Sequence, residues 1–202
     1  MIADKDRSGW FGASDTATIM GNYGTATFKN WWLEKMGLHT NSVNTKAMKA
    51  GTAYEHKILD TIPNVVKDRQ IIIPELRLRV NLDGETDDTI HEVKTHKDTE
   101  FKPPKKYIQQ VNVQMFASGK RKAQIDAYRL TEADYLNYFN EIDLDRLTIH
   151  PVAYDEEFIF LFRYFPSPIL LNLKWLFYLF GYFHLYIYMI RLEVSFVALL
   201  HL

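Results

Sequence analysis

The pattern of apolar and polar positions divides the chain into helical and extended segments. Apolar side chains recur every three or four positions over residues 15–21, 25–36 and 44–59, which predicts three helices. Ser14 or Asp15 is a typical N-cap for the first helix, Thr25 begins the second, and Gly37 ends it. The first part of the chain is therefore predicted to be helical.

The period then changes to two. Residues 65–80 are predicted to be extended, because Leu78 and Val80 alternate with Arg77 and Arg79. We expect residues 71–82 and 90–95 to form a hairpin with its turn at residues 84–89. A helix follows over residues 101–118, opened by a Pro-Pro pair, and then a strand over residues 120–130 with a polar helix or turn after it.

This order of helices, two strands, a helix and a strand indicates an α/β (α+β) fold with a mixed central sheet flanked by helices. The length of 202 residues fits one domain with a substantial core. The absence of cysteine excludes a disulfide scaffold, a thiolate zinc site and a cysteine nucleophile. The polar N-terminus lacks the apolar core of a signal peptide, and we expect a cytoplasmic protein.

The predicted hairpin carries the strongest candidate chemistry. Asp83 follows its first strand, and Glu92 and Lys94 share one face of the second, with Val93 between them pointing into the core. Carboxylates that crowd together need a neutralising cation, and oxygen ligands without cysteine suit Mg²⁺ or Mn²⁺. Such a site hydrolyses phosphodiesters. Taken alone, the stretch fits a solvated hairpin with acidic turn residues better, because an acid, a spacer and Glu-x-Lys form a short and common pattern.

Other side chains join this candidate site or remain open to two interpretations. Glu55 lies among small residues in its predicted helix, where a substrate can approach closely. Tyr107, Gln110 and Gln114 fall on one face of theirs. Trp31 and Trp32 fit the core better than base stacking, and His56 and His91 beside proposed ligands fit a supporting role.

Five segments carry a resemblance to a known family. They are Arg7 with Gly9–Asp15, Gly51–Glu55, Asp83-Gly84, Glu92–Lys94 and Tyr107–Gln110. In this order and spacing they resemble the lambda-exonuclease or YqaJ-like viral recombinase family, a branch of the PD-(D/E)XK nuclease fold with a restriction-endonuclease-like core. The resemblance covers residues 5–130, and Leu82 stands where the signature has proline.

The resemblance implies a role for each matched residue. Asp83, Glu92 and the Val93 carbonyl would bind the metal, Glu55 a second metal, Lys94 and Gln110 the attacking water or scissile phosphate, and Arg7 and Ser14 a 5′-phosphate, while Tyr107, Lys49 and Lys105 would contact DNA. It also implies a Mg²⁺- or Mn²⁺-dependent exonuclease that degrades duplex DNA ends 5′ to 3′ in phage or prophage recombination. The partner would be a single-strand-annealing recombinase, the assembly a ring-shaped trimer, and the location the bacterial host cytoplasm.

Two alternatives share these residues. One is a restriction- or repair-type endonuclease with the same metal site, and the other is a non-catalytic DNA-end-binding or membrane-tethered protein. The second arises from residues 158–202, which carry four charged side chains in 45 residues and 14 of the 29 aromatic ones. We assign residues 1–157 to the nuclease domain. The remainder is a membrane span, part of the core, or out-of-frame sequence, and we favour the last.

Overall fold

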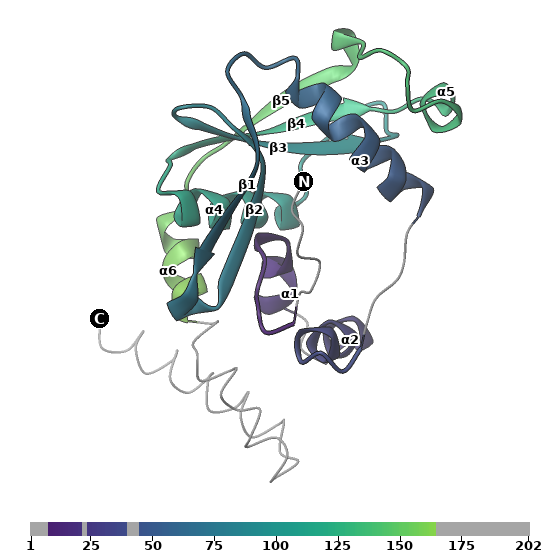
Figure 1. The fold of residues 1–202 in the computed structure, drawn as a ribbon. Coiled ribbons are helices and arrows are strands. Elements are labelled where there is room, and N and C mark those ends of the chain that lie inside the picture. Colours follow the sequence, from purple (N-terminus) through teal and green to yellow (C-terminus); the bar gives the residue numbers. More distant parts are fainter. Residues whose placement is uncertain (1–7, 22–23, 40–44, 165–202) are drawn as a thin grey trace. The chain divides into compact units, whose positions relative to one another are not determined.

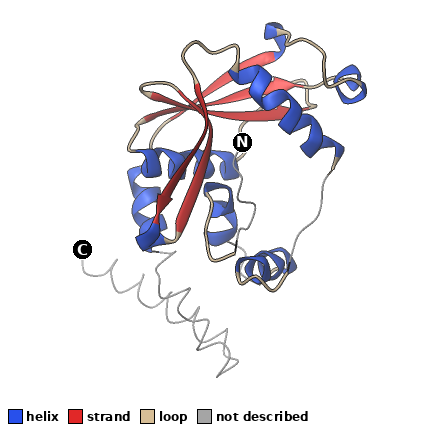
Figure 2. Cartoon of the chain, viewed as in Figure 1, coloured by secondary structure: helices blue, strands red, loops and turns tan. Residues whose placement is uncertain are grey.

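The structure is a computed structural model that describes residues 8–21, 24–39 and 45–164. These residues form a five-stranded mixed sheet in the order β1-β2-β3-β4-β5, with helices on both faces (Figures 1 and 2). The strands are β1 (Val66–Ile73), β2 (Leu78–Glu85), β3 (Thr89–His96), β4 (Lys122–Arg129) and β5 (Leu147–Val152). The mixed sheet flanked by helices that the sequence predicts is confirmed.

The helices begin and end at residues suited to those positions. They are α1 (Thr16–Ile19), α2 (Ala26–Lys35), α3 (Lys46–Leu59), α4 (Lys105–Ser118), α5 (Glu132–Leu136) and α6 (Glu156–Tyr164). The hydroxyls of Thr25 and Thr45 accept hydrogen bonds at 3.2 Å from the first turns of α2 and α3. Gly119 ends α4 with a left-handed backbone, at a φ of 76°.

The sheet contains both parallel and antiparallel pairs of strands. β3 and β4 run parallel over eight residue pairs, and α4 makes the crossover between them. β4 and β5 are antiparallel, as are β1 and β2. β2 and β3 pair only at Gly84↔His91 and Glu85↔Ile90, so these strands separate beyond Gly84. We call the gap between them the fork.

Helices α3 and α4 cover opposite faces of β3. Tyr54 and Ile58 of α3 pack with Val93 and Tyr128, and the Tyr54 and Tyr128 rings stack with centroids 5.7 Å apart. The residue before Val93 on β3, Glu92, faces α4 and accepts hydrogen bonds from it. Burial of the α3 face fixes the register of β3, because a shift of one residue would turn Glu92 into that apolar core.

The predicted hairpin differs from the structure in one respect. The stretch 65–80, which was predicted to be extended, is divided between two strands, β1 and β2, because the chain turns at Pro74–Leu76, and Arg77 follows with a left-handed φ of 50°. Proline cannot donate a ladder hydrogen bond, so it breaks the strand. Asp83 consequently lies within β2 rather than after it.

The end of the described chain also differs from the prediction. The predicted nuclease domain ends at residue 157, but α6 runs from Glu156 to Tyr164 and buries Ile159 and Phe162. The proposed boundary after residue 157 therefore cuts through a packed helix. The rest of the predicted tail lies outside the described residues. Within the described ranges, none of the helices has the length and apolar character needed to cross a bilayer.

Candidate active site

The fork between β2 and β3 brings Asp83 to the backbone of Val93. The Val93 N–H, which has no strand partner on that side, donates to Asp83 Oδ2 at 2.9 Å. In an extended strand the N–H and C=O of one residue point to the same side, so the Val93 carbonyl also faces the fork. The predicted oxygen set of Asp83 and Val93 therefore shares one edge of β3.

Gly84, the residue after Asp83, packs closely against α3 and the residues that follow it. A Cβ at this position would lie 2.5 Å from Leu59 Cδ2 and 2.9 Å from Val65 Cγ2. Both distances are below real Cβ contacts, so a side chain here would force Leu59 and Val65 to shift. Close packing therefore favours glycine at this position.

Glu92 is the buried centre of the site. Its side chain is 1% exposed. The amides of Gln110 and Gln114 donate to its two oxygens, each at 2.5 Å, and Lys94 Nζ contacts Oε1. A buried carboxylate is stable only when such donors satisfy it. The structure therefore confirms that Glu92 and Lys94 point the same way and brings Gln110 to them.

Glu55 approaches from the opposite side on α3. Gly51, one turn earlier, faces β3: a Cβ there would sit 3.4 Å from Thr95 Oγ1. Burial raises the pKa of Glu55, and the nearby Glu92 carboxylate raises it further. Glu55 thus joins the group of acidic side chains from the helix side.

The carboxylates repel one another across the fork. Burial raises the pKa of Asp83 well above its ordinary value, and the Glu92 and Glu55 carboxylates add to this. Burial alone would lower the pKa of Lys94, but Glu92 and Asp83 raise it above the ordinary lysine value. Lys94 thus remains charged, and the site still favours an additional cation.

A cavity of about 530 Å³ opens over these groups. Its lining includes Glu55, Asp83, Glu92, Lys94 and Gln110, together with Trp10, Ser14, Lys35, Arg79 and Asn81. Ser14 reaches it because the N-terminal segment runs along β2: Phe11 N donates to the Arg77 carbonyl and Phe11 O accepts from Arg79 N, both at 2.8 Å. The cavity therefore joins the carboxylates to the segment that carries the proposed phosphate ligand.

The other described residues that were predicted to contact DNA lie on α3 and α4. The Tyr107 ring lies 5.0 Å from Lys94 Nζ and 5.0 Å from Lys106 Nζ, at the start of α4. Lys49 and Lys105 are exposed on α3 and α4. Arg7 lies outside the described residues, so its proposed role stays a prediction.

The aromatic and histidine positions have structural partners. Trp31 Nε1 donates to Asp15 Oδ1 at 2.9 Å and its ring stacks on Phe11, which fits the core interpretation. His91 lies buried with its Nδ1 3.0 Å from Asp126 Oδ2. His56 is paired with the partly exposed Asp68.

Gln114 and Asp68 are two of the residues near the site to which sequence reasoning gave no role. Gln114 was placed on the same helix face as Gln110, and that spacing was the available signal. Asp68 gave no signal, because its position depends on a left-handed backbone, with a φ of 59°, inside a strand.

This arrangement of a mixed sheet with a crossover helix is a fold of the PD-(D/E)XK type. The alkaline exonuclease LHK-Exo from Laribacter hongkongensis has a similar fold, with a TM-score of 0.63, 20% identity and coverage of 94% of this chain and 96% of that one. Its complex with dAMP matches with a TM-score of 0.63 and 21% identity over 83% and 89% of the two chains.

A phage-related exonuclease from Haemophilus somnus 129PT is similar with a TM-score of 0.56 and 15% identity, over 74% of this chain and 86% of that one. None of the curated proteins has detectable sequence similarity to the chain. The model of the YqaJ-like viral recombinase domain matches residues 4–121. The chain belongs to this family, as its motifs predict.

Proposed function

We propose that this chain is a metal-dependent DNA exonuclease that digests duplex ends in phage or prophage recombination. The observation that carries the proposal is the convergence of Asp83, Glu92 and Lys94 at the fork, with Gln110 bound to Glu92. Membership of the YqaJ-like family supports it, as do fold neighbours described as exonucleases.

The donor set fits a hard divalent cation. Asp83, Glu92 and the Val93 carbonyl offer oxygen atoms alone, which suits Mg²⁺ or Mn²⁺, and Glu55 extends the set toward a second cation. The raised pKa values of Asp83 and Glu55 indicate negative charge that Lys94 does not balance. A bound cation would supply Lewis-acid activation of the scissile phosphate and neutralise its developing charge.

The protein's own cation has a separate task. Because the pKa of Lys94 is raised, its Nζ is protonated at neutral pH and donates hydrogen bonds. This supports a role in orienting the attacking water or the phosphate. Gln110 lines the same cavity and holds Glu92 in place with its amide.

Recognition of a DNA end would use the far side of the cavity. Ser14 lines it, and its hydroxyl can donate to a terminal 5′-phosphate beside Arg7. Tyr107 lies between two lysine ammoniums at the cavity side of α4, where it can contact the strand being digested. Lys49 and Lys105 are exposed and would line the duplex path through phosphate contacts.

Digestion of linear and covalently closed circular duplexes tests the proposal. With Mg²⁺ or Mn²⁺ we expect release of mononucleotides from linear DNA, faster from 5′-phosphorylated than from 5′-hydroxyl ends, and none from closed circles. A chelator should abolish the reaction. Cleavage of closed circles at a comparable rate would instead identify an endonuclease, and an inert protein that still binds ends would refute catalysis.

The biological setting follows as part of the same proposal. An exonuclease that leaves single strands in recombination acts together with a single-strand-annealing recombinase, and a ring-shaped trimer would retain the DNA during digestion. We place this activity in the host cytoplasm. Crosslinking of the purified protein checks the trimer, and strand-specific end labels check the 5′ to 3′ polarity.

A further inference from the structure

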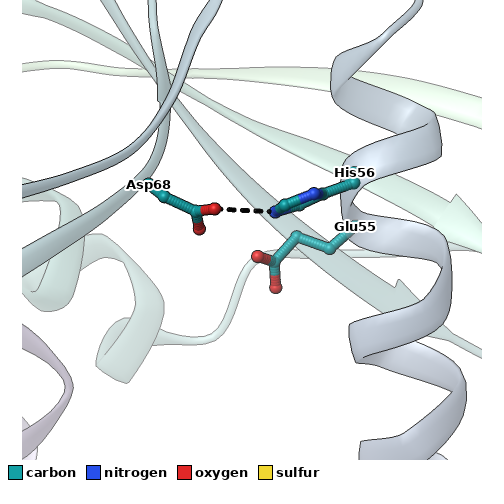
Figure 3. Close-up of side chains that lie close together, drawn as sticks. All are labelled: Glu55, His56 and Asp68. Atoms are coloured by element: carbon teal, nitrogen blue, oxygen red, sulfur yellow. Dashed lines mark ion pairs between the residues drawn. The ribbon is translucent and has the colours of Figure 1, made fainter. Parts of the chain in front are cut away.

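A second group of potential metal ligands lies on the outer side of Glu55. His56 Nε2 lies 3.1 Å from Asp68 Oδ2, and one ligand atom from each of Glu55, His56 and Asp68 falls within 4.8 Å of the others. Figure 3 shows the three side chains directed toward one another from α3 and β1. The group thus joins helix α3 to the edge strand β1.

We propose that Glu55, His56 and Asp68 bind a transition-metal dication such as Mn²⁺. The donor set carries the choice: it combines an imidazole nitrogen with two carboxylates, which first-row transition metals accept and which Mg²⁺ does not prefer. A purely acidic surface cluster would attract any cation weakly, whereas the nitrogen ligand selects among them.

The position of Glu55 gives an independent reason to expect a cation here. Its carboxylate also lines the cavity with Asp83 and Glu92, so it adjoins two groups of donors at once. His56 and Asp68 are partly exposed, at 47% and 24%, so a hydrated ion can reach them.

The inference rests on the proposed function only in sharing Glu55 with the proposed nuclease site. It would make the second cation of that site nitrogen-ligated, and cleavage would then prefer Mn²⁺ to Mg²⁺. The competing explanation is that His56 and Asp68 form an ion pair that fastens α3 to β1 and bind nothing.

Direct Mn²⁺ binding to the full-length, DNA-free protein tests the site, with electron paramagnetic resonance of free Mn²⁺ and calorimetry as readouts. His56→Ala and Asp68→Asn remove one ligand each. Asparagine tolerates the left-handed backbone of position 68, so the second variant keeps the fold. His39→Ala and Asp87→Asn, both at exposed positions, are matched controls.

We expect His56→Ala and Asp68→Asn each to remove one Mn²⁺ equivalent, or to weaken its binding by at least about tenfold, while the controls and Glu92→Gln retain it. Excess Mg²⁺ should not displace this ion. Unchanged Mn²⁺ binding in both ligand variants would overturn the inference and leave the ion-pair explanation. If the two ligand variants lose Mn²⁺ binding but the parent protein cleaves no DNA, the inference stands and the proposed function is refuted.

Discussion

The Gln114 amide donates to Glu92 Oε2 at 2.5 Å, in the buried interior between α4 and β3. Gln110, one turn earlier on α4, donates to the other oxygen, so one helix binds both oxygens of a single carboxylate. Gln114 does not line the cavity, and its own Oε1 has no hydrogen-bond partner among the described residues. Gln114 is thus buried with one oxygen unpaired while its amide nitrogen binds Glu92, which indicates that it positions this carboxylate.

Gln114→Leu should therefore affect the metal site more than the DNA site. Without the amide, Glu92 Oε2 is buried without its donor, which costs about 1–3 kcal/mol of unfolding free energy. We expect the Mg²⁺ concentration for half-maximal cleavage to rise about 10-fold or more, with the KM for DNA unchanged. Gln109→Leu on the same helix is the control, and a change in stability alone would mean that Gln114 has only a structural role.

Two substitutions test the centre of the site. Glu92→Gln preserves size but removes the charge that binds a cation, and Lys94→Ala removes the ammonium that orients water or phosphate. Each should lower cleavage by about 10²-fold or more and leave the circular dichroism spectrum and much of the DNA binding intact. Lys122→Ala, at a distant exposed position, should cleave normally. Near-normal Mg²⁺-dependent cleavage by either site variant would remove the assignment.

The raised pKa of Asp83 makes stability depend on pH in a defined direction. In the unfolded chain this carboxyl loses its proton near the ordinary value of 3.8, whereas in the fold it keeps it to higher pH. Its contribution is therefore present at acid pH and is lost as pH rises through the folded pKa. In chelator, the unfolding free energy measured with urea should fall as pH rises above the ordinary value of 3.8, and Asp83→Asn should flatten this slope.

Divalent cations should reverse that trend, because they bind the deprotonated carboxylates and stabilise the fold by mass action. Addition of Mg²⁺ at the higher pH values is expected to raise the unfolding midpoint of the parent and not that of Asp83→Asn. Equal effects on both proteins would show that the cation acts elsewhere.

Truncation separates the packed helix α6 from the residues after it. A chain that ends after residue 157 loses Ile159 and Phe162, which are buried, and should be less stable by about 3 kcal/mol or more. A chain that ends after residue 166 keeps them. We expect this longer product to unfold cooperatively, to be more soluble than the full chain, and to retain metal-dependent cleavage. Loss of cooperative unfolding in it would assign residues 167–202 to the core.

Sequence reasoning reached most of the site because its chemistry is local. Asp83-Gly84 and Glu92–Lys94 are short motifs on one or two strands, and strand alternation fixes which side chains share a face. The spacing of Tyr107, Gln110 and Gln114 likewise follows from the helix period. These positions could be predicted without knowing how the elements pack.

Other features depended on packing between distant segments. Pro74 should have ended the long predicted strand, but the pairing of β1 with β2 shows only in three dimensions. β5 was missed because its alternation is weak, with Thr148, Ile149 and Pro151 all exposed at the edge of the sheet. Asp68 reaches His56 only because β1 carries a left-handed residue there, which no periodicity predicts.

The fork has a mechanical consequence. The β1–β2 hairpin is joined to β3 by two residue pairs, while Asp83, on the hairpin, and Glu92, on β3, lie on opposite sides of the gap. A cation bound by both carboxylates would link β2 to β3 where the two strands lack a continuous ladder of hydrogen bonds. Backbone amides of β1 and β2 should therefore exchange with deuterium faster in chelator than in Mg²⁺, while those of the continuous β3–β4 ladder stay protected in both.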